Sequence, residues 1–366
     1  MIEIDFERLR TMGLTPALAN QAAALPLSDD DASQLMRVTE VHRDAVQLHD
    51  GEHEHSARCL PRLTRALADD DTAIAVGDWV LAQRDVHGQT WVHERVPPQT
   101  HISRRDADGR RHPVVSNVDT ALLVMGLDDD FNPRRLERYL ALVQSSDVTP
   151  VVVLTKADVV DSVAGALEAR IAELDGRVPA HVELLAVDGT EPRTAQRLAA
   201  WLGQGQTLVV LGSSGAGKST LTNTLLGVAV QDTGAVREHD SRGKHTTTAR
   251  SLHRLPGGAC IIDTPGLRAL RPDVDEATLT ASFGDIESLA ATCRFRDCKH
   301  HDEPGCAVRE GIGADRLRNY HKLLREARRD TMSVLERQQQ LSMWKQRGRE
   351  ARIRMRAKHN TDNNTS

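Results

Sequence analysis

Aromatic residues and cysteines are scarce in this chain of 366 residues. Aromatic side chains make up 3% of the sequence, which makes base stacking along a single nucleic-acid strand an unpromising mode of binding. The five cysteines do not make a disulfide framework in a chain of this length. Three of them, Cys293, Cys298 and Cys306, lie within fourteen residues and call for a separate explanation.

Long apolar runs are also missing. No stretch approaches the roughly 18 consecutive apolar residues that a membrane-spanning helix needs. The N-terminal sequence MIEIDFERLR carries acids and has no apolar centre of a secretory signal. Together with 39% hydrophobic and 27% charged residues, this predicts a globular cytoplasmic protein without a membrane partner. At about 150 residues each, two or three domains are expected.

Charge is unevenly distributed along the chain. Between Arg316 and Lys358, fourteen Lys and Arg stand against four Asp and Glu, a local +10 in a chain whose net charge is −5. A basic terminal segment on an otherwise acidic protein indicates a polyanionic partner. On charge alone, a solvated helix surface is an equal alternative.

The N-terminal part divides into a helical extension and a barrel. Residues 1–34 have helical apolar spacing and end in an acidic break. Residues 35–100 contain short alternating runs separated by glycine and proline turns, which predicts an OB-type β-barrel. An SH3-like barrel would give the same pattern. The polar residues 104–111 are interpreted as a linker.

The spacing of apolar residues changes in the rest of the chain. Residues 113–280 alternate continuous apolar runs with helical segments, which predicts an α/β domain built on a parallel sheet. Residues 281–330 are expected to form a helical domain around the cysteines, and residues 331–366 a basic helix and tail.

A phosphate-binding loop follows the apolar run at 208–211. The pattern G-x-x-x-x-G-K-[ST] stands between a predicted strand and a helix starting near Thr220, which is the context it requires. Backbone N–H groups and the helix N-terminus would face the phosphates. Lys218 should reach the β- and γ-phosphate oxygens, and the Ser219 hydroxyl should hold Mg²⁺. The predicted nucleotide contacts here are Gly212, Ser213, Ser214, Gly215, Ala216, Gly217, Lys218, Ser219 and Thr220.

Asp263-Thr-Pro-Gly266 follows the next apolar strand. The Asp263 carboxylate at a strand end is well placed to hold Mg²⁺ through water. The Gly266 N–H can contact a γ-phosphate.

A purine-recognition motif precedes the phosphate loop. In Thr155-Lys-Ala-Asp158, the carboxylate can accept two parallel hydrogen bonds from guanine N1–H and N2–H₂, and adenine lacks the second donor. Lys156 would lie over the ring. Most GTPases carry this motif after the phosphate loop, whereas Asp158 precedes Gly212 by 54 residues. This order resembles the circularly permuted GTPases.

Cys293-x₄-Cys298-x-His300-x₅-Cys306 supplies three thiolates and an imidazole, a complete tetrahedral set for one structural Zn²⁺. Because no coordination position is left open, a catalytic role is not expected. His301 remains an alternative to His300. Cys59 and Cys260 are interpreted as core residues.

A β-barrel, a permuted GTPase and a Cys-Cys-His-Cys cluster, in this order from about residue 35 to 330, resemble the ribosome small-subunit-dependent GTPase A (RsgA) family. The resemblance implies an OB fold and GTP hydrolysis stimulated by the small (30S) ribosomal subunit in its late maturation. In this interpretation the barrel, the zinc-binding domain and the basic C-terminal helix contact 16S rRNA. We expect a monomer. The alternatives are an rRNA-binding assembly factor whose nucleotide only sets conformation, and a P-loop ATPase or kinase, which Asp158 disfavours.

Carried over by position, the resemblance makes Thr155, Lys156 and Asp158 the guanine site. Thr155 stands for the more general Asn, and we expect a looser tether to the phosphate loop. The fifth motif would fall at Leu185-Ala186, where the Ala186 N–H could meet the guanine oxygen, although Leu185 departs from the usual serine.

Residues 243–248 (GKHTTT) resemble the first switch, where Thr247 is favoured slightly over Thr246 as the Mg²⁺ ligand. Leu267 stands where Ras-like enzymes carry a water-orienting glutamine, and leucine cannot polarise water. We therefore hypothesise that His245 positions the attacking water. The catalytic residues would then be His245 and Lys218. A solvent-exposed loop histidine is the alternative.

Overall fold

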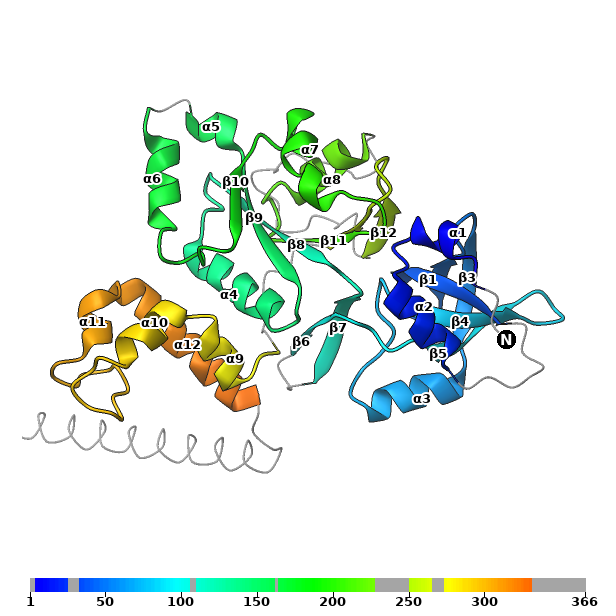
Figure 1. Ribbon diagram of the computed structural model, residues 1–366, viewed down its shortest axis with the longest axis horizontal. Helices are drawn as coiled ribbons and strands as arrows, with labels where there is room; N and C mark the ends of the chain where they lie inside the picture. Colours follow the sequence, from blue (N-terminus) through cyan, green and yellow to red (C-terminus); the bar gives the residue numbers. More distant parts are fainter. Residues whose placement is uncertain are drawn as a thin grey trace, which may run out of the picture.

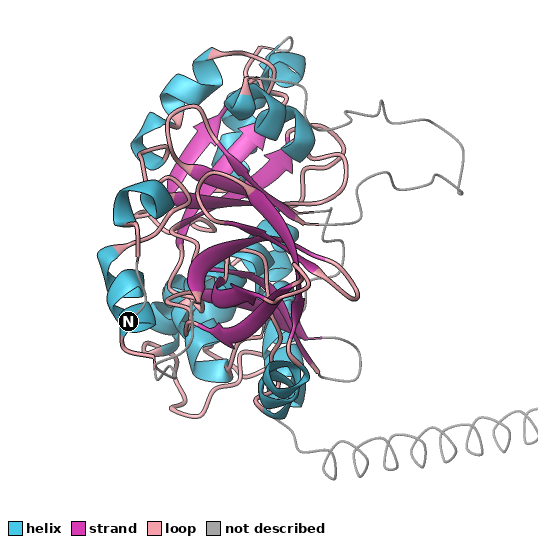
Figure 2. Cartoon of the chain, turned by 90° about the vertical axis from the view of Figure 1, so that its right-hand side faces the viewer, coloured by secondary structure: helices cyan, strands magenta, loops and turns pink. Residues whose placement is uncertain are grey.

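The computed structural model describes residues 4–25, 33–105, 110–161, 164–227, 250–264 and 273–330. Two short helices are followed by a β-barrel, a sheet with helices on both faces, and a group of C-terminal helices (Figure 1). The view turned by 90° shows the strands in the middle of the molecule (Figure 2). No helix in these described ranges is long and apolar enough to cross a bilayer.

The N-terminal segment is helical, in two short pieces: α1 (Phe6–Arg10) and α2 (Pro16–Ala23). The first begins at Asp5 and the second at Thr15, whose side chains accept backbone N–H groups of the first turn. The apolar side chains share the hydrophobic cluster of the central sheet, and the fully buried ones include Leu9, Met12, Leu14 and Leu18. The segment is therefore part of the protein core.

The barrel is closed and has five strands in the order β1-β2-β3-β5-β4, with β1 pairing back to β4. Strand β3 runs parallel to β5, and a helix follows β3. This Greek-key order is that of an OB fold, so the SH3-like alternative is wrong. The strands are β1 (Gln34–Val41), β2 (Val46–His49), β3 (Glu54–Cys59), β4 (Trp79–Arg84) and β5 (Thr90–Arg95), and the helix is α3 (Pro61–Asp69).

The predicted parallel sheet is confirmed. Its order is β10-β9-β8-β11-β13-β12, and all neighbours are parallel except β12 and β13. Strands β8 and β11 are buried throughout, as expected for a sheet covered on both faces. The strands are β8 (Thr120–Gly126), β9 (Thr149–Thr155), β10 (Glu183–Ala186), β11 (Thr207–Leu211), β12 (Ser251–Arg254) and β13 (Cys260–Asp263).

Helices cover the two faces of this sheet separately. Leu136 and Leu140 of α4 (Pro133–Gln144) pack with Leu123 of β8 on one face. Leu221 of α8 (Lys218–Leu226) packs with Leu122 on the other. Smaller helices complete the layers: α5 (Ala157–Asp161), α6 (Ala166–Glu173), α7 (Arg193–Arg197) and a 3₁₀ turn (Ala199–Trp201).

Barrel and sheet are joined at β1. One residue pair, Glu40 and Ser251, links β1 to β12, so the two sheets are continuous. The neighbouring Arg37 is fully buried, and its guanidinium donates to the carbonyl oxygens of Met12 and of Asn117, the latter at 2.8 Å. It thereby connects the N-terminal helices, the barrel and the α/β sheet.

The interpretation of residues 104–111 as a linker is wrong at both ends. Strands β6 (His101–Arg105) and β7 (Arg111–Ser116) form an antiparallel pair. The arginines of these strands look like residues of a solvated linker in the sequence. In the structure Arg105 and Arg111 form ion pairs with Asp273, more than 160 residues away. A contact over that separation cannot be predicted from the neighbouring sequence.

The C-terminal helices share one small core. They are α9 (Glu276–Ala281), α10 (Gly284–Ala290), α11 (Ala307–Gly311) and α12 (Ala314–Asp330). Phe283, Ile286 and Leu323 are buried together, and Ala141 of α4 joins them. Glu137 of α4 is 3% exposed and accepts hydrogen bonds from Arg316 at 2.7 Å and Asn319 at 2.6 Å. Packing and a buried ionic contact thus attach these helices to α4.

Candidate functional site

The phosphate loop connects β11 to α8, and its glycines are required by its shape. A Cβ on Gly212 would lie 2.4 Å from the carbonyl oxygen of Val124. Gly215 and Gly217 have φ of +87° and +90°, a conformation that other residues rarely adopt. A side chain is therefore excluded at Gly212 by lack of room, and disfavoured at Gly215 and Gly217 by the backbone conformation.

Lys218 lies at the start of α8 and is 6% exposed. Its Nζ donates to the carbonyl oxygen of Ser213 at 2.7 Å. Burial lowers the pKa of Lys218, while the carboxylates of Asp263 and Asp130 act in the opposite direction. Ser219 and Thr220 follow in the first turn of the same helix, and Ser214 is exposed at the loop.

Asp263 ends β13 beside the phosphate loop and is 5% exposed. Burial raises its pKa, against the charge of Lys218. Its Oδ1 is buried and has no hydrogen-bond partner among the described residues. A buried carboxylate oxygen left in this way fits a hydrated Mg²⁺, since oxygen ligands are those that Mg²⁺ prefers.

The base motif is attached to the phosphate loop by two side chains. The Thr155 hydroxyl donates to the carbonyl oxygen of Ala216 at 2.6 Å, and Lys156 Nζ donates to that of Gly215 at 2.8 Å. The Thr155 hydroxyl thus tethers the base motif directly to the loop, and the expectation that this tether is looser than that of an asparagine stays a prediction. Lys156 has a left-handed φ of +61°, uncommon for a side-chain-bearing residue and typical of functional sites.

The other elements of the base site end at the same edge of the sheet. Asp158 is exposed in α5, directly after the motif strand β9. Ala186 is the last residue of β10, in register with Leu154. The carboxyl ends of β8, β9, β10 and β11 thus converge where the base and phosphate motifs meet, the usual ligand site of open α/β sheets.

Two further acidic residues belong to this region and were missed from the sequence. Asp128 Oδ2 accepts from Lys156 Nζ at 2.6 Å, and Asp130 Oδ1 accepts from the Ser213 hydroxyl at 2.5 Å. Their signal was an acidic run directly after a buried strand. Their partners, however, follow 28 and 83 residues later.

Several predicted residues lie outside the described part of the chain. These are His245, the alternatives Thr246 and Thr247, Gly266 and Leu267.

The cysteine cluster is assembled as the spacing predicted. One donor atom from each of Cys293, Cys298, His300 and Cys306 lies within 4.8 Å of the others. The sulfurs of Cys293 and Cys306 are 4.0 Å apart, and each lies 3.7 or 3.4 Å from His300 Nδ1. Tetrahedral Zn²⁺ with its usual bond lengths requires separations of about 3.5–3.8 Å.

The adjacent histidine is engaged elsewhere. The His301 ring packs against the ring of His321 with centroids 4.3 Å apart. His300, with a left-handed φ of +59°, faces the cysteines. The choice between the two histidines therefore falls on His300.

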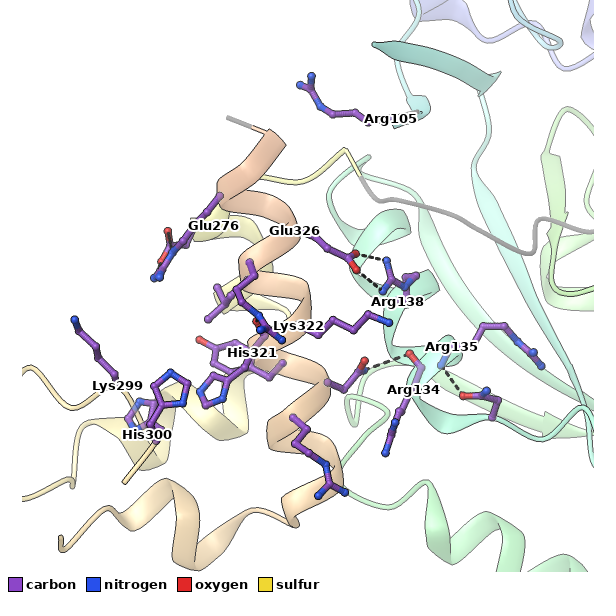
Figure 3. A pocket seen from close by; sticks show the side chains of 18 of the residues that line it. Arg105, Arg134, Arg135, Arg138, Glu276, Lys299, His300, His321, Lys322 and Glu326 are labelled. Carbon is purple, nitrogen blue, oxygen red and sulfur yellow. Dashed lines mark hydrogen bonds and ion pairs between the residues drawn. The ribbon is translucent and has the colours of Figure 1, made fainter. Parts of the chain in front are cut away.

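A basic hollow of about 1360 Å³ lies between α12, α4, β6 and the cysteine cluster (Figure 3). Ten of its lining residues are Lys or Arg and two are Glu. The two glutamates pair with Arg138 and Arg328. Aspartates outside the lining pair with four further arginines, which are Arg105, Arg134, Arg135 and Arg318. The lining itself therefore carries an excess of eight cationic side chains over acidic ones. Figure 3 shows Lys322 of α12 and Arg138 of α4 on its facing sides.

Comparison with known proteins shows the family. A profile of the RsgA GTPase family matches residues 95–272. A relative from Xanthomonas campestris pv. campestris (strain B100), called small ribosomal subunit biogenesis GTPase RsgA, is 48% identical over 295 residues, 78% of this chain and 79% of the relative. A relative of the same name from Xanthomonas axonopodis pv. citri (strain 306) is 48% identical over 298 residues. These residues cover 79% of this chain and 80% of the relative. The chain belongs to the RsgA GTPase family.

Two solved structures share the fold of this chain. The crystal structure of YjeQ from Thermotoga maritima aligns with a TM-score of 0.55 at 22% identity, covering 81% of this chain and 98% of that one. YloQ, described as a circularly permuted GTPase, aligns with a TM-score of 0.55 at 21% identity, covering 84% and 100%. Family membership makes this chain a GTP hydrolase that uses GTP and Mg²⁺.

Proposed function

We propose that this RsgA-family protein acts in biogenesis of the small ribosomal subunit, binding that particle and hydrolysing GTP in response to it. The supporting observation is the direct contact between its base motif and its phosphate loop. There Thr155 and Lys156 donate hydrogen bonds to two consecutive carbonyl oxygens of the loop. Relatives 48% identical over most of the chain carry the name small ribosomal subunit biogenesis GTPase.

In this proposal the loop Gly212–Ser219 and Thr220 hold the phosphates through backbone N–H groups. Lys218 contacts the β- and γ-phosphates, and Ser219 holds the Mg²⁺ that neutralises them. Asp263 holds the same ion through water. The buried Oδ1 of Asp263 and the low exposure of Lys218 support these roles.

Guanine would be read at the other end of the site. Asp158 pairs with guanine N1–H and N2–H₂, Lys156 covers the ring, and the Ala186 N–H faces the guanine oxygen. Lys156 is supported best, because it reaches the Gly215 carbonyl and Asp128 from the backbone position next to Thr155.

The hydrolytic step needs a group that orients water. His245 is proposed for it, with Thr247 and Gly266 completing the switches around Mg²⁺ and the γ-phosphate. Changing His245 to alanine should remove most of the subunit-stimulated turnover and leave GTP affinity within about twofold. Full stimulated turnover in that variant would reject the role.

The hollow is proposed to bind the phosphate backbone of 16S rRNA. Its ten cationic side chains face an opening large enough for several phosphates, and the chain continues into the basic residues 331–366. We propose that the protein binds the subunit as a monomer. The Cys-Cys-His-Cys cluster would hold one Zn²⁺ and keep the adjoining wall of the hollow in place.

The proposal is tested by steady-state GTP hydrolysis during titration with purified small subunits, with large subunits as the control and Lys218→Ala as the blank. Strong stimulation by the small subunit alone is the expected result. Tight binding of the particle with flat turnover would instead support an rRNA-binding factor in which nucleotide only sets conformation. Flat turnover without binding would reject both.

A further inference from the structure

Asp130 touches both the phosphate loop and an arginine of the basic hollow. Its Oδ1 accepts from the Ser213 hydroxyl at 2.5 Å and from the Arg135 guanidinium at 2.6 Å. Its Oδ2 accepts from the backbone N–H of Gly126 at 3.2 Å. The side chain is 13% exposed, so all these interactions operate in partly desolvated surroundings.

Arg135 forms the other side of this contact. It stands in the first turn of α4, also donates to the backbone carbonyl of Asp130, and lines the hollow (Figure 3). Its side chain remains 24% exposed. A phosphate entering the hollow can therefore compete with Asp130 for the same guanidinium, because arginine binds phosphate at least as well as carboxylate.

The loop that carries Asp130 also reaches the base motif. Its Asp128 accepts from the backbone N–H of Asp130 at 3.3 Å and from Lys156 Nζ at 2.6 Å. Lys156 in turn donates to the Gly215 carbonyl. The segment between β8 and α4 is thus linked to the phosphate loop at Ser213 and at Gly215.

The charges of Asp130 and Arg135 both extend to the nucleotide site. Each acts electrostatically on the buried ammonium group of Lys218, Asp130 favouring its charged form and Arg135 opposing it. Because the region is largely buried, interactions over these distances are weakly screened. Removing one of the two charges changes the potential that the nucleotide phosphates meet.

We propose that Arg135, Asp130 and Ser213 couple the hollow to the phosphate loop, so that a phosphodiester backbone bound in the hollow weakens the binding of GDP. When an RNA phosphate binds the Arg135 guanidinium, the Asp130 carboxylate loses its counter-charge. The carboxylate then repels the nearby diphosphate of GDP. By reciprocity, bound GDP weakens RNA binding by the same factor. This inference rests on the proposed contact between the hollow and rRNA, and makes Asp130 a positioning residue that acts through its neighbours.

The test measures the affinity of the full-length protein for fluorescently labelled GDP, alone and with saturating small ribosomal subunits. GDP avoids interference from hydrolysis. For the wild type we expect the subunits to weaken GDP binding about tenfold, within the usual range of coupling between sites.

Three variants separate the coupling from general effects. Asp130→Asn keeps an oxygen for the Ser213 hydroxyl and removes the charge, so GDP should bind at least as tightly and respond to subunits less than about twofold. Arg135→Ala should weaken GDP binding several-fold without subunits, and subunits should add little. The matched control Arg325→Ala removes another hollow arginine, one that hydrogen-bonds the His321 carbonyl; it should weaken subunit binding but keep the full response at saturation.

A wild-type response in Asp130→Asn, or unaltered GDP affinity in Arg135→Ala, would overturn the coupling. Subunit binding with no change in wild-type GDP affinity would overturn the coupling and leave the proposed function standing. Absence of subunit binding by the wild type would reject both.

Discussion

At the scale of single residues, Thr155 joins base recognition to phosphate binding through one hydroxyl. It is 1% exposed, and a valine of nearly the same shape would leave the Ala216 carbonyl without its partner. A buried unpaired carbonyl costs about 1–3 kcal/mol. We expect Thr155→Val to weaken GDP binding roughly tenfold, measured by fluorescence titration, whereas Thr155→Ser should stay within about twofold. Equal affinities in the two variants would contradict the tether.

The residues of this site differed in how far sequence could predict them. Lys218, Thr155 and Asp263 carry recognisable motifs, because phosphate and purine chemistry restrict both residue type and spacing. Asp128 and Asp130 carry none. Their roles come from partners that only the fold brings near, such as Ser213, 83 residues later. Sequence likewise gives the residue type at Thr155 but not the direction of its hydroxyl, which in the fold reaches the Ala216 carbonyl.

At the scale of elements, the strands that could be predicted are those whose residues carry a clear local pattern of burial. The strands with continuous apolar runs, β8, β9 and β11, were predicted because burial on both faces leaves a clear pattern. Strand β3 leaves a weaker pattern, because Ala57 is its one buried side chain. The β6–β7 pair was missed because its arginines point to a distant aspartate.

The β6–β7 pair is attached to the chain ahead of α9 by Asp273. Burial raises the pKa of this carboxyl, but the Ser103 hydroxyl, at 2.9 Å, and the guanidinium groups of Arg105 and Arg111 outweigh burial and hold the pKa below its usual value. A lowered folded-state pKa means that Asp273 contributes stability above about pH 3.9, its unfolded value. That contribution is lost as the pH falls through the folded-state pKa.

Replacing this carboxylate tests the attachment. Asp273→Asn should lower the free energy of unfolding by about 1–3 kcal/mol at pH 7, because two partly buried guanidinium groups lose their counter-charge. At an acid pH below the lowered folded-state pKa of Asp273, the wild-type carboxyl is protonated as well, and the difference from the wild type should shrink. Urea unfolding at both pH values measures it. An equal difference at both would show that charge is not the cause.

The cysteine cluster gives a second prediction for an element. A short segment between α10 and α11 has few apolar contacts of its own, so bound Zn²⁺ should supply much of its stability. We expect one equivalent of zinc in the purified protein by elemental analysis. Chelation should make residues 293–306 sensitive to protease and leave GDP affinity unchanged, with Cys298→Ser behaving as the chelated protein. His301→Ala is the control and should retain zinc, because its ring packs against His321.

At the scale of the whole molecule, an acidic protein gathers ten of its 47 Lys and Arg side chains around one hollow. The chain has a net charge of −5, yet ten Lys and Arg line the hollow between the α/β domain and the C-terminal helices. From sequence, the charge of residues 316–358 was visible but its other half was not. Arg104, Arg105, Arg134 and Arg135 come from segments far upstream and join it only in the fold.

This arrangement predicts how particle binding depends on salt. Each cationic side chain that neutralises a phosphate releases a counterion, so the logarithm of affinity falls with that of salt concentration by a little under one per contact. Replacing Arg318, Lys322 and Arg325 together with alanine should reduce that slope by about two to three and leave basal GTP hydrolysis unchanged. The matched control changes Arg58, Arg62 and Arg65 of the barrel region, none of which lines the hollow. An unchanged slope in the hollow variant, or an equal loss in the barrel variant, would mean that the rRNA phosphates bind elsewhere.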